Sequence, residues 1–595
     1  MEKQRLTLFI ILSAVILFGS QFLLQKFFPP PKQPTAEQVT QATTPTPVPT
    51  ATPLQIPRQS STQPASLPPV ELREIVLKSN FWNGKLSNQG AVLIDWTMTH
   101  SPNGKPVDPP QGVNLISAQK SQEIGAPLRL FIPSDRNLEK ELNSARYTLA
   151  EEAGQNLEIK PDERRTITFN YGNTSGVSAS KTIIFNGAGF DFDLKVDVKR
   201  NGQPIETYVV VGPNFGDQTL KSYGYYKPAP QLSYSAAGSV VHHAGSDVKT
   251  ADPEAVKESN ILWAAVDDNY FALALVPASP AKTASLINFK HKESIEGKEE
   301  ERNYVSIAIP VVNDQISHIY AGPKDLDMLA QVNKQFGLAN QEKNLEYLIS
   351  YGWNIIAWIV KPIASFMRSA FIHLYGWTGN YGWAIIILTV VLNMFFFPLR
   401  WRSSVSMKKA AALQPKMKDL QERMKKLDKN DPRTAELQKE QVALMREGNP
   451  LMGCLPLVLQ MPFFWAVFIV LSSAIEFRNA RFVGWIHDLS SPDPWFVLPV
   501  IFVISMIVQT ALTPSTADPM QKRMQYFMPL MMGYFFIYAP AGLVLYWMVG
   551  NLVGIAQQYI INRITPNPPT QTNDKTTPPS TKGKKPKELL ATSLF

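Results

Sequence analysis

The sequence predicts an α-helical polytopic membrane protein with six transmembrane helices and a large extracytoplasmic domain of the all-β sandwich type. Three observations carry this prediction. Long uncharged apolar runs lie near the N-terminus and after residue 378. Short runs of alternating apolar and polar residues fill the region between residues 70 and 335. Lys and Arg gather in the segments that the predicted topology places on one side of the membrane.

Composition limits the classes of site that the chain can hold. It has 595 residues, 45% of them hydrophobic, and a net charge of +9. A single cysteine, Cys454, excludes an intrachain disulfide framework. Seven histidines show no metal-ligand spacing, and the one pair, His242–His243, is typical of a surface loop. The sequence therefore predicts no metal site and no cofactor.

Residues 1–28 are predicted to form an N-terminal signal-anchor helix. Residues 6–24 are uncharged and long enough to span, and Lys3 and Arg5 before them place the N-terminus in the cytoplasm. A cleaved signal peptide is the alternative, but the run is long and no clear small-residue cleavage site precedes Lys26. Residues 29–69 are rich in Pro, Thr, Gln and Ala, which predicts a disordered linker.

Residues 70–335 are predicted to form the β-sandwich domain. Apolar and charged residues alternate strictly from Phe190 to Lys199, as in a strand with one buried face. Asn201–Gly202 predicts a hairpin turn, with residues 208–211 as the return strand. Further strands are expected at residues 73–77, 91–97, 261–266, 271–276 and 304–311. Acidic residues are plentiful here but form no recognisable catalytic constellation.

Residues 336–378 are predicted to form an interfacial amphipathic helical segment. Residues 347–360 are uncharged but too few to span. An apolar pattern is then interrupted by Lys361, Arg368 and His373. This favours a helix that lies in the membrane–water interface on the extracytoplasmic side. A kinked span bent at Pro362 is the alternative, but it would bury Lys361 in the bilayer.

Residues 379–563 are predicted to form a core of five helices, with spans at residues 381–400, 451–475, 494–517, 524–539 and 543–562. Pro540–Ala541–Gly542 separates the last two. A cytoplasmic helical hairpin is expected at residues 401–447, because thirteen Lys or Arg stand against seven Asp or Glu between residues 400 and 447, and Asp431–Pro432 is a typical helix start. Residues 564–595 predict a basic, disordered cytoplasmic tail.

Four uncharged polar residues lie inside the predicted spans: Thr389, Asn393, Gln460 and Asn551. One interpretation is interhelical hydrogen bonding, worth about 1 kcal/mol each. The other is a shared wet cavity open to the cytoplasm, which their number and the basic hairpin favour. No Asp or Glu lies inside a span, and no P-loop, HExxH or GxSxG motif is present. This pattern argues against a proton-coupled pump, an ATPase and a hydrolase.

Six motifs resemble the YidC/Oxa/Alb family of membrane protein insertases: GNYGWAIIILTVVLNMFFFPL (379–399), LQPKM (413–417), NPLMGCLPLVLQMPFF (449–464), WIHDLSSPDP (485–494), TADPMQKRM (516–524) and PAGLVLYWMVGNLVGIAQQ (540–558). The resemblance covers residues 353–563. The anchor, the Pro-rich linker and the large β domain resemble the long YidC form of Gram-negative bacteria. This resemblance implies a multi-pass protein of the bacterial inner membrane, with both termini cytoplasmic and a periplasmic domain similar to sugar-binding β-supersandwich folds.

The family resemblance also implies a function without enzyme activity or nucleotide use. Nascent membrane proteins would enter a hydrophilic groove open to the cytoplasm, alone or beside the Sec translocon, and the protein would assist their folding as a chaperone. Gln460 would lie in the groove, with Thr389 and Trp547 near it, and Met461 and Tyr546 would lie on the substrate path. Ribosome contact through the basic tail and contact with membrane lipids are implied, without direct recognition of nucleic acid.

The chain departs from the family pattern at Asn393, where bacterial members usually carry an arginine. An amide still offers donors and an acceptor, so a groove there can remain wet. The charge attraction for acidic substrate flanks then needs another source. We hypothesise that Arg400 and Arg402 supply it at the groove entrance.

Two other classes of function compete with this interpretation. A solute transporter or channel would show inverted repeats and ionisable residues at the membrane midplane, and neither is visible in the sequence. A cell-envelope enzyme acting on saccharide through the β domain would need a convergent carboxylate pair, which the sequence alone leaves open.

Overall fold

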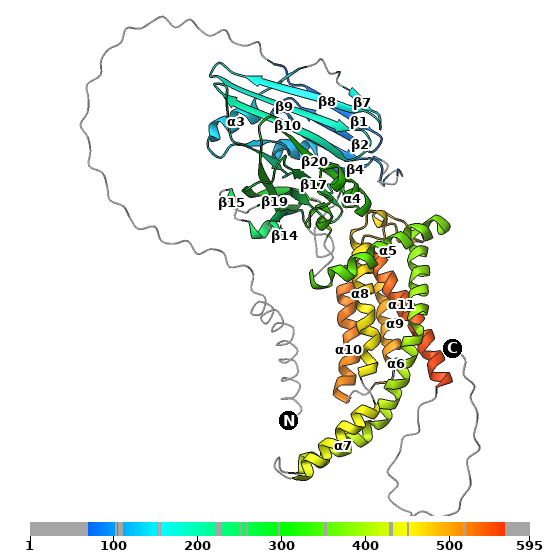
Figure 1. Ribbon diagram of the computed structural model, residues 1–595. Helices are drawn as coiled ribbons and strands as arrows, with labels where there is room; N and C mark the ends of the chain where they lie inside the picture. The colour runs from blue at the N-terminus through cyan, green and yellow to red at the C-terminus, as the bar shows by residue number, and fades with distance from the viewer. Residues whose placement is uncertain are drawn as a thin grey trace, which may run out of the picture. The chain divides into compact units, whose positions relative to one another are not determined.

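The computed structural model describes residues 70–565 except for short internal gaps. The gaps are residues 102–103, 105–106, 108–110, 151–153, 155, 220–228, 237, 249–252, 257–259, 296–297, 350–353, 428–431, 449–450 and 516–518. The predicted signal anchor, the predicted linker and the predicted tail beyond residue 565 lie outside the described residues. Figure 1 shows the β-rich part and the helical part of the described chain.

Three sheets build the β domain. The first has five strands in the order β4 (Val113–Ile116), β3 (Val92–Met98), β2 (Trp82–Ser87), β1 (Glu74–Ser79) and β7 (Asn156–Ile159). The third has the order β15 (Glu254–Val256), β18 (Ala284–Ile295), β19 (Lys298–Val311), β12 (Thr207–Val211) and β5 (Leu130–Phe131). Pairing is antiparallel except between β1 and β7, which run parallel.

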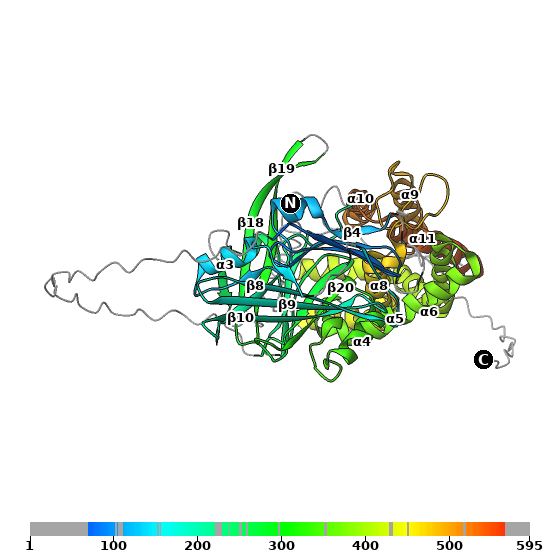
Figure 2. The ribbon, with the colours of Figure 1, turned by 90° about the horizontal axis from the view of Figure 1, so that it is seen from above.

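The second sheet has ten strands. Its main path runs β14 (Ser239–His243), β13 (Gln231–Ala236), β16 (Ala264–Asp267), β17 (Phe271–Val276), β20 (Ile316–Pro323), β10 (Asp191–Arg200), β9 (Val177–Asn186), β8 (Arg164–Gly172) and β6 (Thr148–Leu149), while β11 (Gln203–Pro204) pairs with β10. Figure 2 shows the long strands β8, β9 and β10 side by side. Three short helices accompany the sheets: α2 (Ala118–Glu123), α3 (Arg136–Ser144) and α4 (Leu326–Gln335).

An aromatic cluster joins the first sheet to the second and forms the centre of the sandwich core. Trp82 and Trp96, on β2 and β3, stack with ring centroids 4.1 Å apart and are fully buried. Phe185 and Phe192, on β9 and β10, pack against them. Each indole N–H donates to a backbone carbonyl of the facing chain, at 2.8 and 2.9 Å, so the buried polar atoms are satisfied. The predicted β sandwich is therefore present.

The strand predicted from the alternation after Phe190 is confirmed as β10, but its predicted partner is wrong. Asn201 and Gly202 both have positive φ, as a tight hairpin turn requires, and the chain returns as β11 beside β10. The segment at residues 208–211 belongs instead to β12, which pairs with β19 and β5 in another sheet. All five residues of β12 are buried, as expected for an inner strand rather than a hairpin arm with one exposed face.

Seven helices form the rest of the described chain: α5 (Asn354–Thr378), α6 (Tyr381–Lys426), α7 (Pro432–Gly448), α8 (Leu451–Ser473), α9 (Val497–Leu512), α10 (Pro519–Phe536) and α11 (Ala541–Ile564). Helix α6 packs against α8 and α11, α9 packs against α11, and α10 packs against α9 (Figure 1). Within the described residues, α6 and α11 are long and apolar enough to cross a membrane, and parts of α8 and α9 are shorter apolar helices. The count of six spans stays a prediction.

Helix boundaries differ from the predicted ones in two places. The predicted span at residues 381–400 and the first helix of the predicted hairpin are one helix, α6, which continues through Pro398 and Pro415 for 46 residues. Lys522 and Arg523, predicted to lie in a loop, belong to the first turns of α10. The predicted break at Pro540 is confirmed, because α10 ends at Phe536 and Pro540 caps α11.

Candidate functional site

One face of α6 carries the polar residues Thr389, Asn393 and Arg400, spaced four and seven residues apart. Thr389 and Asn393 are buried, and Arg400 is half-buried. Two of these side chains bond to the helix backbone, which lets them lie in an apolar helix. Thr389 Oγ1 donates to the carbonyl of Ile385 at 2.6 Å, and Asn393 Nδ2 donates to the carbonyl of Thr389 at 2.8 Å.

Helix α11 approaches this face closely through two glycines. An ideal Cβ built on Gly550 would lie 3.9 Å from the amide nitrogen of Asn393, and one built on Gly554 would lie 2.7 Å from the guanidinium of Arg400. Gln557, one turn further, links both α6 residues. Its Nε2 donates to the carbonyl of Asn393 at 3.0 Å, and its Oε1 accepts from Arg400 Nη1 at 3.3 Å.

The same contact continues along both helices beyond Arg400. Ser404 and Gln558 bond through their side chains at 3.0–3.3 Å. Lys408 donates to the carbonyls of Ile561, at 3.4 Å, and Thr565, so its ammonium lies at the negative end of α11. We call this polar contact the α6–α11 seam; its residues are Thr389, Asn393, Arg400, Ser404, Lys408, Gly550, Gly554, Gln557 and Gln558.

Arg400 is the feature of the seam that packing alone does not explain. Interhelical hydrogen bonds between neutral groups account for Gln557 and Gln558. Arg400 instead brings a full charge to the helix contact, and among the residues that the structure describes no carboxylate forms an ion pair with it. A cation away from bulk water and without a counter-ion is costly and is typically functional.

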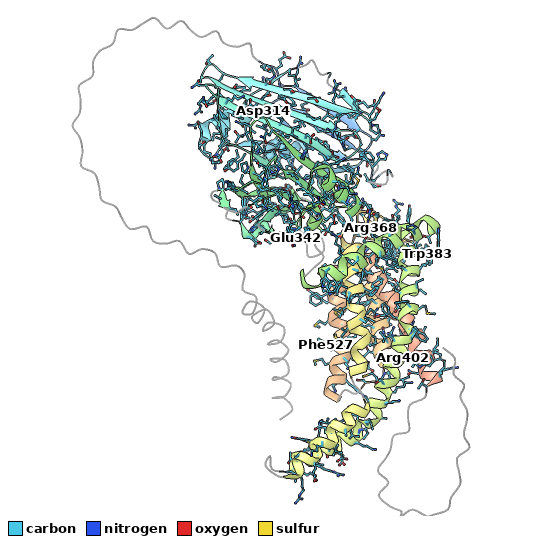
Figure 3. All side chains as sticks on the ribbon, viewed as in Figure 1. Asp314, Glu342, Arg368, Trp383, Arg402 and Phe527 are labelled. Carbon is cyan, nitrogen blue, oxygen red and sulfur yellow. The ribbon has the colours of Figure 1, made fainter. Side chains whose placement is uncertain are left out.

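Arg402, which was predicted to act with Arg400, lies in a different environment. Its side chain is exposed on α6 and is labelled in Figure 3. Arg400 instead contacts Gln557 of α11. Two residues along a helix correspond to a rotation of about 200°, so neighbours at this spacing face opposite sides. The two arginines therefore cannot act as one group.

The other predicted site residues are distributed over the helical part. Asn551 is half-buried and donates to Ser505 Oγ of α9 at 3.2 Å, so it joins α11 to α9 rather than to Asn393. Gln460 is half-buried on α8, and the adjacent Met461 is 41% exposed. Tyr546 is buried within the helical core.

Trp547 lies in an aromatic cluster formed by three other helices. Its ring centroid is 4.8 Å from those of Phe464 and Phe536 and 5.9 Å from that of Phe502. Its indole N–H is buried and has no hydrogen-bond partner among the described residues. The side chain thus holds α8, α9, α10 and α11 together while keeping one donor unused.

Sequence reasoning did not include Gln557, Gln558, Ser404, Lys408 or Ser505 in the candidate site. The Gly550–Gly554 pair was the available signal, because glycines four residues apart allow two membrane helices to approach closely. A polar residue on such a face, as at Gln557, then meets the neighbouring backbone. In the described ranges no group of three His, Cys, Asp or Glu side chains is placed to hold a metal ion.

Comparison with known proteins gives matches along most of the chain. Residues 74–366 match the family model described as the YidC periplasmic domain, and residues 373–568 match the 60Kd inner membrane protein family. The membrane protein insertase YidC of Ralstonia nicotianae is 30% identical over 598 residues, which cover 95% of this chain and 98% of that protein. The chain belongs to the YidC family of membrane protein insertases.

Other YidC proteins match at similar levels. YidC of Cupriavidus taiwanensis is 34% identical over 398 residues, covering 66% of this chain and 67% of that protein. A crystal structure described as an active YidC insertase with its first transmembrane domain resolved aligns with 82% of this chain and 94% of its own, at 15% identity and a TM-score of 0.31. The family assignment rests on the sequence matches, which place a YidC periplasmic domain before an inner membrane helical region.

Proposed function

We propose that this YidC family member inserts nascent membrane proteins into the bacterial inner membrane and helps them fold. In this proposal six helices span the membrane, both termini and the α6–α7 hairpin are cytoplasmic, and the β domain is periplasmic. The family assignment supports the general activity. The observation that carries the specific mechanism is Arg400, a cation at the α6–α11 seam without a carboxylate partner in the described chain.

The acidic flank of a substrate provides the carboxylate that Arg400 lacks. Family members usually carry an arginine at the position of Asn393, and Arg400 lies two turns along the same face of α6. In this proposal Arg400 supplies the positive charge that the family resemblance implies at the position of Asn393. Thr389, Asn393, Gln460 and Asn551 line the groove in this proposal, and the exposed Arg402 attracts the substrate at the entrance.

The apolar segment of the substrate moves along the exposed faces of α8 and α10. Met461 is 41% exposed, and its flexible thioether suits contact with many different sequences. Phe527 on α10, labelled in Figure 3, is 62% exposed. Tyr546 and Trp547 support this path from the helical core. The Sec translocon, the ribosome through the basic tail, and lipids are the remaining proposed partners.

Insertion into liposomes tests the role of Arg400. The purified full-length protein is reconstituted, and a small single-span substrate is supplied with either an acidic or a neutral translocated tail. Arg400→Gln should lower insertion of the acidic substrate about tenfold, as expected for loss of a charge-assisted contact, and leave the neutral substrate nearly unchanged. Arg402→Gln should have a smaller effect that added salt removes, because an exposed charge is screened.

Arg423→Gln is the matched control for the charge change. Arg423 lies on the same helix, is 59% exposed, and pairs with Asp419 on its own surface. Relative to the wild type, unchanged insertion of the acidic substrate by Arg400→Gln, or an equal fall for both substrates, would disprove the proposed role of Arg400. Transport of small solutes without any insertion by the wild-type protein would instead favour the transporter alternative.

A further inference from the structure

A cavity of about 370 Å³ lies where the α5–α6 turn meets the loop that follows α8. Tyr375 and Tyr381 form one aromatic wall, with stacked rings 4.1 Å apart. Glu476, Arg478 and Arg481 of the loop line the other side, and apolar residues of β3 and β4 contribute to the lining. The cavity is separate from the α6–α11 seam, because the two share no residue.

The carboxylate of Glu476 is incompletely satisfied in this cavity. Its side chain is 7% exposed, and its Oε1 accepts from Arg368 Nε at 3.0 Å and from Nη2 at 2.5 Å. Its Oε2 is buried and has no hydrogen-bond partner among the described residues. A buried carboxylate oxygen without a donor costs free energy, so the position favours a ligand that can donate.

The charges around Glu476 favour a cationic donor. Arg368 also pairs with Asp325, whose side chain is 2% exposed, so one guanidinium serves two buried carboxylates. A third partner, Asp327, is 89% exposed and is screened by water. Burial raises the pKa of Glu476 above its ordinary value, while the nearby Arg368 opposes this shift.

The loop that carries Glu476 also brings cations to the cavity lining. Arg478 is neutralised by Asp217, at 2.8 Å, with both side chains buried. Arg481 is exposed, and no ion pair to it is found in the described part of the chain. A ligand that complements both charges therefore carries an ammonium group for Glu476 and an anionic group for Arg481.

Two exposed tryptophans place the cavity at the depth of lipid head groups. Trp377 is 86% exposed and Trp383 is 48% exposed, and they flank the cavity-lining turn at residues 379–381. Exposed tryptophan is enriched where membrane meets water. Figure 3 shows Trp383 and Arg368 at the same end of the helical part, away from Arg402. In the proposed topology this end lies at the periplasmic surface of the inner membrane.

We propose that this cavity binds the head group of a zwitterionic phospholipid with a primary ammonium, as in phosphatidylethanolamine. The ammonium donates to Glu476 Oε2, and the phosphate lies against Arg481. The placement of the cavity at the outer leaflet rests on the proposed topology, whereas the ligand chemistry rests on the cavity residues. Such a lipid would fix the α5–α6 turn against the loop after α8.

Native mass spectrometry of the full-length protein tests this binding without any insertion substrate, so the result is independent of the insertase proposal. The protein is released from nanodiscs that contain phosphatidylethanolamine, phosphatidylcholine or phosphatidylglycerol. Wild-type protein should retain phosphatidylethanolamine about tenfold better than phosphatidylcholine, whose methylated nitrogen has no N–H to donate. Equal retention of these two lipids would overturn the proposal, and this comparison needs no variant.

Variants then assign the two contacts. Glu476→Gln should lower retention of phosphatidylethanolamine to the level of phosphatidylcholine, and Arg481→Gln should lower retention of phosphatidylethanolamine and phosphatidylglycerol alike. Asp327→Asn is the control, because this carboxylate also contacts Arg368 but is exposed. Soluble phosphoethanolamine should fail to displace the lipid at equal concentration. Full displacement would overturn the lipid assignment in favour of a free zwitterion.

Discussion

Arg368 and Arg400 are both withdrawn from water in the helical part, yet their surroundings are opposite. Arg368, on α5, contacts the carboxylates of Asp325, Asp327 and Glu476. Arg400, on α6, has one neutral partner, Gln557, and no carboxylate among the described residues. The first site has more negative charge than its arginine balances, and the second has none.

This difference separates a structural charge from a charge available to a ligand. Removing Arg368 would leave the buried carboxylates of Asp325 and Glu476 without their cation, so this arginine is needed for the fold. Removing Arg400 leaves no buried charge without its partner. The free-energy cost of taking its guanidinium out of water is already present in the native protein. A protein retains such a cost where a visiting group relieves it.

The sharpest test compares the stability of two arginine variants. Arg368→Met should lower the free energy of unfolding by about 3–5 kcal/mol, because Asp325 and Glu476 stay buried without their cation. Arg400→Met should cost far less, since no carboxylate is left behind. Thermal unfolding of the detergent-solubilised protein measures both. Combining Arg368→Met with Asp325→Asn and Glu476→Gln should restore much of the lost free energy of unfolding. If Arg368→Met and Arg400→Met lower that free energy equally, the two arginines do not differ in the way described here.

A second test moves Arg400 without changing its charge. In Gly554→Ala the new Cβ would lie 2.7 Å from the guanidinium, so the end of the flexible side chain has to shift off α11. Insertion of a substrate with an acidic tail should fall about fivefold, roughly 1 kcal/mol in the barrier, with little change in thermal stability. Gly550→Ala is the control, because its Cβ would make only ordinary contacts, at 3.9 Å. Similar insertion by both variants would show that the position of Arg400 is unimportant.

A pH titration extends the comparison to the buried acids of the β domain. Burial raises the pKa of Asp268 to about 6, although three backbone N–H groups donate to it. The folded pKa exceeds the unfolded value of about 3.9, so the stabilisation is fully present below the unfolded pKa and is lost as the pH rises through about 6. Lowering the pH from 7 to 5 should therefore add about 1 kcal/mol of stability at this site.

Asp268→Asn isolates this contribution. The melting temperature of the wild-type protein at pH 5, relative to that of the variant, should exceed the same difference at pH 7. Asp217 and Arg478 lie beside Asp268, but their mutual ion pair is retained in both proteins. Parallel pH profiles for the two proteins would show that Asp268 does not carry the effect.

The smallest expected effect concerns the neutral part of the helical core. Asn551→Ala removes the 3.2 Å hydrogen bond to Ser505 and should cost about 0.6 kcal/mol, as is typical between membrane helices. A double-mutant cycle with Ser505→Ala measures the coupling. Insertion should also fall, because Asn551 lines the proposed groove, and unchanged insertion by Asn551→Ala would exclude this residue from it.

The sequence predicted the β domain and the family well because those predictions rest on local patterns. Alternation identified β10, and Asn201–Gly202 identified its turn. The partner of β12 was missed because sheet pairing at long range has no local signature in a strand that is buried on both faces. The continuity of α6 was missed because a change from apolar to charged composition at Arg400 does not end a helix.

The candidate site was only partly predicted, because sequence patterns report local features and not contacts between distant residues. Thr389, Asn393 and Arg400 were found because polar residues are conspicuous inside an apolar run. Their partners were not, because Gln557 contacts Asn393 across 164 residues of sequence. The grouping of Arg400 with Arg402 followed from their proximity in sequence, which the rotation of a helix makes misleading.

The continuity of α6 has a mechanical consequence. A helix of 46 residues is about 69 Å long, and this one joins the turn before Tyr381 to the basic hairpin through Arg400 without a loop between them. Between these two ends it contacts α11 along the seam. Binding of a nascent chain to the hairpin would therefore also displace the part of α6 that carries Asn393 and Arg400. Capture at one end and rearrangement at the other would then be coupled through one continuous helix, which passes through Pro398 and Pro415 without a break.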